Sequence, residues 1–241
     1  MSGAEAVIWH DVECGRYRAD LPLWRELAKA EEGPILDVGA GTGRVSLDLA
    51  RRGHEVVALD REPAFLDALR ARCGSSRRVQ TVVGDAACFD LGDRRFGLIV
   101  APMQTIQLLG GAGRAGFLRC ARKHLTPHGL VACALADAME AFDAEHVVLP
   151  LPDLGLVDGV RYYSQPVALR DAGDRMAIER IRTTVSPSGE RSAGDDVIHL
   201  DKVGAADVEA EALAAGLWPR AARVIPPTDE HVGTTVVMLR G

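Results

Sequence analysis

Between residues 33 and 136, short apolar runs alternate with longer segments in which apolar residues recur every three or four positions. The apolar runs predict five buried strands: Pro34–Val38, Glu55–Leu59, Val79–Val83, Phe96–Ala101 and Gly129–Leu135. The periodic segments predict helices between the strands: Arg44–Arg52, Pro63–Cys73 and Ala115–Leu125. Such alternation is typical of a parallel sheet covered by helices on both faces. A further helix is expected ahead of the first strand, from an Asp20 N-cap, with Pro22 in its first turn, to Ala30.

The pattern changes after residue 137, where runs typical of β-strands follow one another without helices between them. The runs are Val160–Leu169, Arg175–Val185 and Asp195–Val203, and the residues that separate them are typical of hairpin turns. We therefore expect a three-stranded antiparallel insert. After it, the sequence predicts one helix, Ala205–Ala215, and two final strands near Arg220–Ile225 and Thr234–Leu239.

The composition fits a globular protein and disfavours two classes of partner. Of the 241 residues, 47% are hydrophobic and 26% are charged, and the formal net charge is -6. The acidic excess disfavours non-specific binding to nucleic acid or to anionic membranes, because both require surplus Lys and Arg. No apolar run approaches the roughly 20 residues of a membrane span, and the first residues do not resemble a signal peptide. The five scattered cysteines are expected to be reduced thiols in the cytoplasm, without a metal.

The most informative segment contains three alternating glycines after the first predicted strand. This segment, Ile35–Arg44, reads ILDVGAGTGR, so a strand ends, the chain turns tightly and a helix begins. Glycine allows such a turn and lets a ligand approach the backbone. The next predicted strand is followed directly by Asp60, where a carboxylate could accept both hydroxyl groups of a ribose.

Two nucleotide cofactors compete for this motif. A dinucleotide-binding turn requires its third glycine at the position of Arg44, whereas here that glycine comes one residue earlier. Asp37 would repel a pyrophosphate, but it suits a ligand that carries an ammonium and a sulfonium group. The spacing therefore favours S-adenosylmethionine over NAD, and a phosphate-binding loop is excluded because no Gly-Lys-Ser/Thr follows.

With these motifs, nearly the whole chain resembles the class I S-adenosylmethionine-dependent methyltransferases. Gly84-Asp85-Ala86 matches the family's adenine-recognising position, and Phe96–Pro102 resembles the fourth motif, whose strand end faces the transferring methyl group. Tyr17 resembles an N-terminal tyrosine that closes over the cofactor, although packing in the core is an equal alternative. The resemblance implies a cofactor site made of Tyr17, Asp37, Gly39, Ala40, Gly41, Gly43, Arg44, Asp60, Arg61, Asp85, Ala86 and Ala101.

The end of the fourth strand excludes several kinds of catalysis. Pro102-Met103-Gln104 lacks the motifs of DNA amino-methylating enzymes and the cysteine of cytosine-carbon enzymes. No carboxylate stands there for magnesium, although Asp137 follows the fifth strand closely. No general base is identifiable; weak catalytic candidates are His231, His10, Tyr162 and Tyr163, while His54 and His124 are expected to face solvent. The expected acceptor-binding residues are Pro102, Met103, Gln104 and Tyr162.

We therefore predict an α/β fold with a Rossmann-like, doubly wound sheet that is mostly parallel with an antiparallel last strand, plus an antiparallel β lid insert. The expected parts are a helical segment covering the cofactor site (1–32), the S-adenosylmethionine-binding core (33–146), the lid (147–203) and a C-terminal helix with the last two strands of the sheet (204–241).

The expected reaction is S-adenosylmethionine-dependent methyl transfer to a nitrogen or oxygen atom of a small molecule, which leaves S-adenosylhomocysteine. A protein side chain as acceptor, or a protein that binds the cofactor without catalysis, are the alternatives. The lid would place Tyr162 or Tyr163 over Met103 and Gln104, and a dimer interface is its other possible role. We expect a monomer or homodimer without nucleic-acid or membrane partners.

Overall fold

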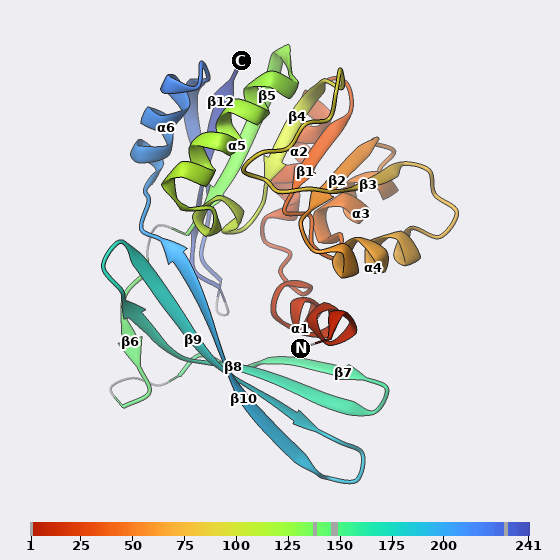
Figure 1. The fold of residues 1–241 in the computed structure, drawn as a ribbon, viewed down its shortest axis with the longest axis vertical. Helices are drawn as coiled ribbons and strands as arrows, with labels where there is room; N and C mark the ends of the chain where they lie inside the picture. The colour runs from red at the N-terminus through yellow and green to blue at the C-terminus, as the bar shows by residue number, and fades with distance from the viewer. Residues whose placement is uncertain (1, 137–138, 146–148, 229–230) are drawn as a thin grey trace.

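In the computed structural model, which describes residues 2–136, 139–145, 149–228 and 231–241, the chain forms a seven-stranded sheet and a separate antiparallel sheet (Figure 1). The seven strands lie in the order β11-β12-β5-β4-β1-β2-β3. Five of them are parallel: β1 (Ile35–Val38), β2 (Val56–Asp60), β3 (Val79–Val83), β4 (Phe96–Ala101) and β5 (Leu125–Leu135). The last strand, β12 (Thr234–Arg240), lies antiparallel between β5 and β11 (Trp218–Ile225), as predicted.

Helices cover both faces of the seven-stranded sheet. On one face, apolar side chains pack beneath α2 (Leu21–Ala30), α3 (Arg44–Arg51) and α4 (Pro63–Cys73). On the other face they pack beneath α5 (Gly110–His124) and α6 (Ala205–Ala214). Every residue of β1, β2 and β4 is buried, which explains why these strands are apolar apart from Asp37 and Asp60. The predicted doubly wound α/β fold is confirmed.

The insert forms a larger sheet than the predicted three-stranded one. Its five antiparallel strands are β6 (Phe142–Asp143), β7 (Asp153–Val157), β8 (Val160–Asp171), β9 (Arg175–Val185) and β10 (Arg191–Asp201). The strands that the sequence did not predict, β6 and β7, are short and both pair with the same edge of β8. β6 has only two residues, and in the five residues of β7 the alternation is limited to the exposed Leu154 and Leu156, so both strands are too short for periodicity to detect.

An N-terminal helix, α1 (Gly3–Cys14), lies between the two sheets (Figure 1). On the core side, Arg72 of α4 donates to the Asp11 carboxylate. On the other side, the Trp9 ring meets the Tyr162 ring edge-on, with centroids 5.1 Å apart. The helix therefore joins the core to the antiparallel sheet.

Two polar residues play roles other than those predicted. Asp20 precedes α2, but its carboxylate does not cap the helix; it accepts from Trp24 Nε1 (2.7 Å) and from both terminal nitrogens of Arg44 (2.5 and 2.7 Å). Charge-assisted bonds to a guanidinium are stronger than a bond to a backbone amide. His124, expected to face solvent, is fully buried and accepts the Leu91 amide at Nε2 (3.2 Å). Its ring nitrogens satisfy backbone groups that burial would otherwise leave unpaired.

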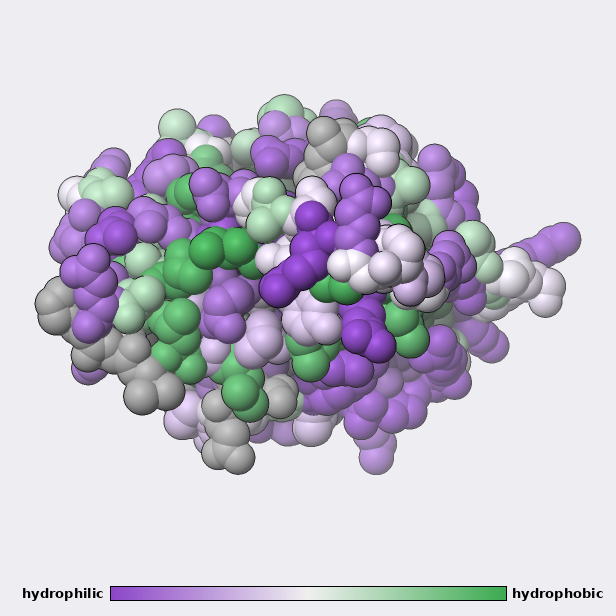
Figure 2. Space-filling view, turned by 90° about the horizontal axis from the view of Figure 1, so that it is seen from below, coloured by the Kyte–Doolittle hydropathy of each residue, from purple (hydrophilic) through white to green (hydrophobic). Residues whose placement is uncertain are grey.

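The surface of the antiparallel sheet mixes apolar and charged groups. Exposed apolar side chains occur on three of its strands: Leu154, Leu156, Ile181 and Val197. Figure 2, which views the molecule from below, shows hydrophobic residues among hydrophilic ones on that face. Within the described part of the chain, no helix is both long and apolar enough to cross a membrane.

Candidate active site

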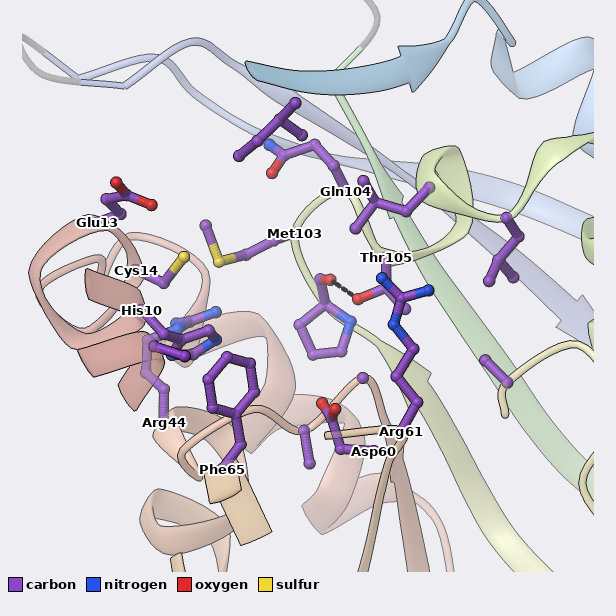
Figure 3. A pocket seen from close by; sticks show the side chains of 18 of the residues that line it. His10, Glu13, Cys14, Arg44, Asp60, Arg61, Phe65, Met103, Gln104 and Thr105 are labelled. Atoms are coloured by element: carbon purple, nitrogen blue, oxygen red, sulfur yellow. Dashed lines mark hydrogen bonds between the residues drawn. The ribbon is translucent and has the colours of Figure 1, made fainter. Parts of the chain in front are cut away.

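A cavity of about 410 Å³ lies at the carboxyl ends of the parallel strands, and α1 and the antiparallel sheet form its other walls (Figure 3). Open α/β sheets bind their ligands at this edge. The predicted site residues that line it are His10, Asp37, Gly39, Ala40, Arg44, Asp60, Arg61, Asp85, Ala86, Pro102, Met103 and Gln104. The predicted residues outside its lining are Tyr17, Gly41, Gly43, Ala101, Tyr162, Tyr163 and His231.

The glycine turn is required for packing as well as for its backbone conformation. Gly39 and Gly41 have positive φ angles of 70° and 55°, which L side chains adopt only with strain. A Cβ atom on Gly39 would lie 2.6 Å from the Thr105 side chain, and one on Gly41 would lie 2.5 Å from Cε1 of His10. The space beside Gly41 is therefore filled by α1, whereas the sequence predicted that a ligand would lie there.

Asp37 ends inside the cavity wall with one of its oxygens unsatisfied. The Ser46 hydroxyl donates to Oδ2 at 2.6 Å, whereas Oδ1 is buried and has no hydrogen-bond partner in the described part of the chain. Burial raises the pKa of the Asp37 carboxyl to about 6, against the lowering effects of the Ser46 bond and of Arg44. A buried carboxylate oxygen without a donor carries a desolvation cost that a cationic ligand can relieve.

The two other acids at the strand ends bind neighbouring backbone amides. Asp60 accepts from Gly41 N at 2.8 Å through Oδ2 and from Glu62 N at 2.9 Å through Oδ1. Each oxygen of an ionised carboxylate has a second lone pair, so Asp60 can accept further hydrogen bonds. Asp85, which is exposed, accepts from Ala87 N at 2.8 Å through Oδ1. Both acids therefore have fixed orientations before any ligand binds.

The end of β4 forms the floor between the core and the antiparallel sheet. Met103 has a positive φ of 54°, which is uncommon for a residue with a side chain, and the Thr105 hydroxyl donates to Pro102 O at 2.8 Å (Figure 3). The Gln104 amide lines the cavity without a hydrogen-bond partner in the described residues. The described residues contain no cluster of three or more His, Cys, Asp or Glu suited to a metal, and Asp137 lies outside them.

The antiparallel sheet contributes its wall through β9 and β10. Three apolar side chains, Ile178, Ile198 and Leu200, face the cavity together with Arg180 and Arg182. The predicted tyrosines belong to the neighbouring strand β8 and do not reach the lining. Tyr162 instead supports the wall from behind, through its edge-on contact with Trp9. The sequence could not show which strand of the insert faces the core.

Tyr17 and His231 lie together behind the cavity wall. Their rings are 4.7 Å apart, and the guanidinium of Arg44 lies 5.2 Å from the centre of the Tyr17 ring. Arg44 is held on its other side by Asp20, so Tyr17 contacts the cavity through Arg44. Neither Tyr17 nor His231 belongs to the lining of the cavity.

Apart from His10, the pocket residues on α1 were not predicted from the sequence. Trp9 and Glu13, one helical turn apart, and Cys14 all line the cavity. Arg182 donates to both oxygens of Glu13 (2.8 and 2.9 Å), and the Ser164 hydroxyl adds a third bond (2.8 Å). The four-residue spacing of Trp9 and Glu13 indicates that both side chains lie on one face of a helix. The sequence does not show what covers that face, because the covering sheet comes about 150 residues later in the chain.

Replacing Glu13 with alanine should destabilise the protein, because Arg182 loses two of its three charge-assisted hydrogen bonds and keeps only the one to Asp196. We expect a loss of roughly 1.5–3 kcal/mol in the free energy of unfolding, measured by urea titration. Burial alone would raise the pKa of Glu13, but the hydrogen bonds from Arg182 and Ser164 and the charge of Arg180 lower it. The stability that the pair contributes should therefore be present above the unfolded pKa of Glu13 and be lost as the pH falls through its lowered folded pKa.

An exposed pair that is also joined by two hydrogen bonds provides the control for Glu13. Arg223 donates to both oxygens of Glu26 (2.7 and 2.9 Å), and both side chains are largely exposed. Glu26→Ala should change stability little. Equal losses for Glu13→Ala and Glu26→Ala would show that burial does not strengthen the contact between α1 and the sheet.

Comparison with known proteins identifies the core of the chain. Residues 35–129, which contain the glycine turn and all three strand-end acids, match the family model described as a methyltransferase domain. A malonyl-[acyl-carrier protein] O-methyltransferase of Xylella fastidiosa is 28% identical over 155 residues, which are 63% of this chain and 49% of that protein. The chain thus spans about half the length of this curated relative, and about a quarter of the length of two others.

Solved structures share the fold over more than nine tenths of the chain. S-adenosylmethionine-bound CalS10, an amino pentose methyltransferase from Micromonospora echinaspora, has a TM-score of 0.73 at 21% identity, covering 97% of both chains. The glycopeptide N-methyltransferase MtfA in complex with S-adenosylhomocysteine has a TM-score of 0.62 at 25% identity, covering 91% of this chain and 86% of that one. Residues 35–129 therefore form a methyltransferase domain, and the chain as a whole shares the fold of the methyltransferases CalS10 and MtfA.

Proposed function

We propose that this protein binds S-adenosylmethionine in the cavity and transfers its methyl group to a nitrogen or oxygen atom of a small molecule. The observation that carries the proposal is the buried, unpartnered Oδ1 of Asp37 in the cavity wall. An orphaned carboxylate oxygen at this position requires a cationic ligand group, and the ammonium of S-adenosylmethionine is one. A pyrophosphate, the alternative ligand of a glycine turn, would be repelled.

The other residues of the core fit the remaining parts of the cofactor. Asp60 retains lone pairs for the ribose hydroxyls, and Asp85, with Ala86 beside it, is available for the adenine amino group. When bound, S-adenosylmethionine supplies a methyl group on a positively charged sulfur. The exposed Arg61 side chain lies over the same end of the cavity (Figure 3).

The remaining cavity residues would bind and shield the acceptor. Met103, Ile178, Ile198 and Leu200 provide an apolar lining that excludes water, and Gln104 offers an amide that can orient a polar acceptor group. This lining supports the role of residues 147–203 as a lid over the acceptor. The similarity to CalS10 and MtfA, an amino pentose methyltransferase and a glycopeptide N-methyltransferase, supports nitrogen as the acceptor atom.

The test is formation of S-adenosylhomocysteine from S-adenosylmethionine in the presence of a panel of amines and phenols. We expect product only with an acceptor of a size that the cavity can enclose. Calorimetric titration with S-adenosylmethionine alone, run in parallel, separates binding from catalysis. Binding without product from any acceptor would favour a catalytically silent protein, and absence of binding would refute the proposal.

Replacing Asp60 should weaken cofactor binding while the protein remains folded. We expect Asp60→Ala to reduce the affinity for S-adenosylmethionine by about 1.5–3 kcal/mol, the range for hydrogen bonds to a charged group. The loss includes an indirect part, because Asp60 also holds the amides of Gly41 and Glu62. Asp85→Ala is the control for a strand-end acid with a single backbone contact, and we expect it to have the smaller effect. Unchanged affinity in folded Asp60→Ala would exclude Asp60 from the site.

A further inference from the structure

We propose that His10 of α1 is a cofactor-binding residue, whose Nε2 accepts a hydrogen bond from a ribose hydroxyl of the nucleoside held at Asp60. The inference rests on the proposed function and deepens it. It gives the N-terminal helix, which precedes the matched methyltransferase domain, a direct contact with the ligand.

Hydrogen bonding around Thr42 defines the tautomer of His10. The Thr42 hydroxyl lies 2.6 Å from Asp11 Oδ1, and a carboxylate can only accept, so the hydroxyl hydrogen points to Asp11. His10 Nδ1 lies 3.3 Å from the same hydroxyl oxygen, which has only lone pairs left to offer. Nδ1 must therefore carry the hydrogen in this bond, and in the neutral ring Nε2 is left as an acceptor.

Nε2 of His10 lies beside Gly41, and the backbone amide of Gly41 is hydrogen-bonded to Asp60. Nε2 and Cε1 form the ring edge that packs against Gly41, whose amide donates to Asp60 Oδ2 at 2.8 Å. The Phe65 ring packs against the imidazole, with the two ring centroids 4.5 Å apart. Figure 3 shows His10, Phe65 and Asp60 on the same side of the cavity.

An acceptor at this position complements the hydrogen-bonding capacity of Asp60. A ribose presents two hydroxyl hydrogens, and the Asp60 oxygens already accept one backbone amide each. His10 Nε2 has no hydrogen-bond partner in the described residues. A ribose hydroxyl can donate its hydrogen to Nε2, whereas the cofactor's carboxylate has no hydrogen to donate.

The protonation state of His10 supports this role near neutral pH. Burial lowers the pKa of His10, while the charges of Asp11, Asp60 and Glu13 raise it and that of Arg44 lowers it. Arg72 of α4 offsets Asp11, since it donates to both Asp11 oxygens. The ring is therefore neutral at pH 7, and protonation in acid would turn Nε2 from an acceptor into a donor.

The test uses 5′-methylthioadenosine and its 2′- and 3′-deoxy forms, which lack the amino-acid part and so do not engage Asp37. His10→Asn keeps a donor near Thr42 but removes the acceptor at Nε2, and His10→Gln restores a carbonyl oxygen there. By calorimetric titration, we expect His10→Asn to weaken binding of 5′-methylthioadenosine about five- to tenfold, with partial recovery in His10→Gln. His199→Asn, on an exposed residue of β10, is the control.

The hydroxyl analogues and the pH profile separate a direct contact from a structural one. Removing the hydroxyl that contacts His10 should weaken wild-type binding but should not weaken His10→Asn further. Below pH 6.5, the ordinary pKa of histidine, wild-type affinity should fall more steeply than that of His10→Asn. The assignment would be overturned if the loss of affinity from His10→Asn added to the loss from removing either hydroxyl group. It would also be overturned if wild type and His10→Asn had identical pH profiles. If wild type binds neither 5′-methylthioadenosine nor S-adenosylmethionine, the proposed function itself fails.

Discussion

Replacing Asp37 with asparagine is expected to lower the affinity for S-adenosylmethionine by roughly 10- to 100-fold near neutral pH. The amide oxygen of the new side chain would still accept the Ser46 hydrogen bond, so the local packing is retained. What disappears is the negative charge at the buried Oδ1 atom, which has no other partner in the described residues. The loss should therefore appear in the interaction with the ligand's ammonium group and not in the fold.

The same substitution should leave the unliganded protein at least as stable as wild type. The folded-state pKa of Asp37 is raised from 3.8 to about 6, because burial disfavours the charged form. A raised pKa means that the folded state binds the proton more tightly, so stability falls as the pH rises between these values. Above pH 6 the penalty is complete and corresponds to about 3 kcal/mol, which asparagine does not incur.

Two titrations decide whether Asp37 has this role. Binding of 5′-methylthioadenosine, which has no ammonium, should be nearly equal in wild type and Asp37→Asn, whereas binding of S-adenosylmethionine should differ. The difference should shrink below about pH 6, where wild-type Asp37 becomes protonated. If Asp37→Asn weakens both ligands equally, the carboxylate acts through the shape of the glycine turn and not through its charge.

The sequence was sufficient to predict the core because the spacing of its apolar residues matches the positions that are buried in the structure. The strands β1, β2 and β4 are buried throughout, and the helices between them show the apolar spacing of one covered face. The N-terminal helix α1 was missed as an individual element because it has two covered sides. Asp11 contacts the core, while Trp9 and Glu13 contact the antiparallel sheet, so no single apolar stripe forms.

The part of the cavity lining that comes from the ends of the parallel strands was predictable, whereas the part that comes from the insert was not. Asp37 and Asp60 lie near the ends of β1 and β2, and Asp85 follows β3; the ends of these parallel strands must meet at one edge of the sheet. The part from the insert depends on which face of the insert turns inward, and that is determined by long-range contacts. The pairing of Glu13 with Arg182 selects β9 for the cavity wall and leaves Tyr162 behind Trp9.

Replacing Gly41 with valine should reduce the affinity for S-adenosylmethionine by more than about 100-fold and should also lower stability. The backbone at Gly41 has a φ of 55°, which costs a residue with a side chain roughly 1–2 kcal/mol and a β-branched one more. The added Cβ would also lie 2.5 Å from Cε1 of His10. Because the His10 ring is packed against Phe65, relief of this overlap requires α1 to move away from the core.

A glycine with the same backbone conformation separates strain from steric overlap. Gly74, after α4, has a φ of 56°, but a Cβ there would meet no atom within 4 Å. Gly74→Val should therefore cost the strain alone, measured as a small loss in the free energy of unfolding with unchanged cofactor affinity. Equal effects of Gly41→Val and Gly74→Val would show that α1 does not pack on the turn.

Making room at position 10 provides the decisive comparison. His10→Ala removes the ring that the new Cβ would strike, so the double variant Gly41→Ala with His10→Ala should unfold at a higher urea concentration than Gly41→Ala alone. The free energy of unfolding of the double variant should be about 1–2 kcal/mol lower than that of His10→Ala, which is the cost of the positive φ at position 41. Additive losses in the double variant would mean that the two residues do not touch, and α1 would then not be part of the wall beside the glycine turn.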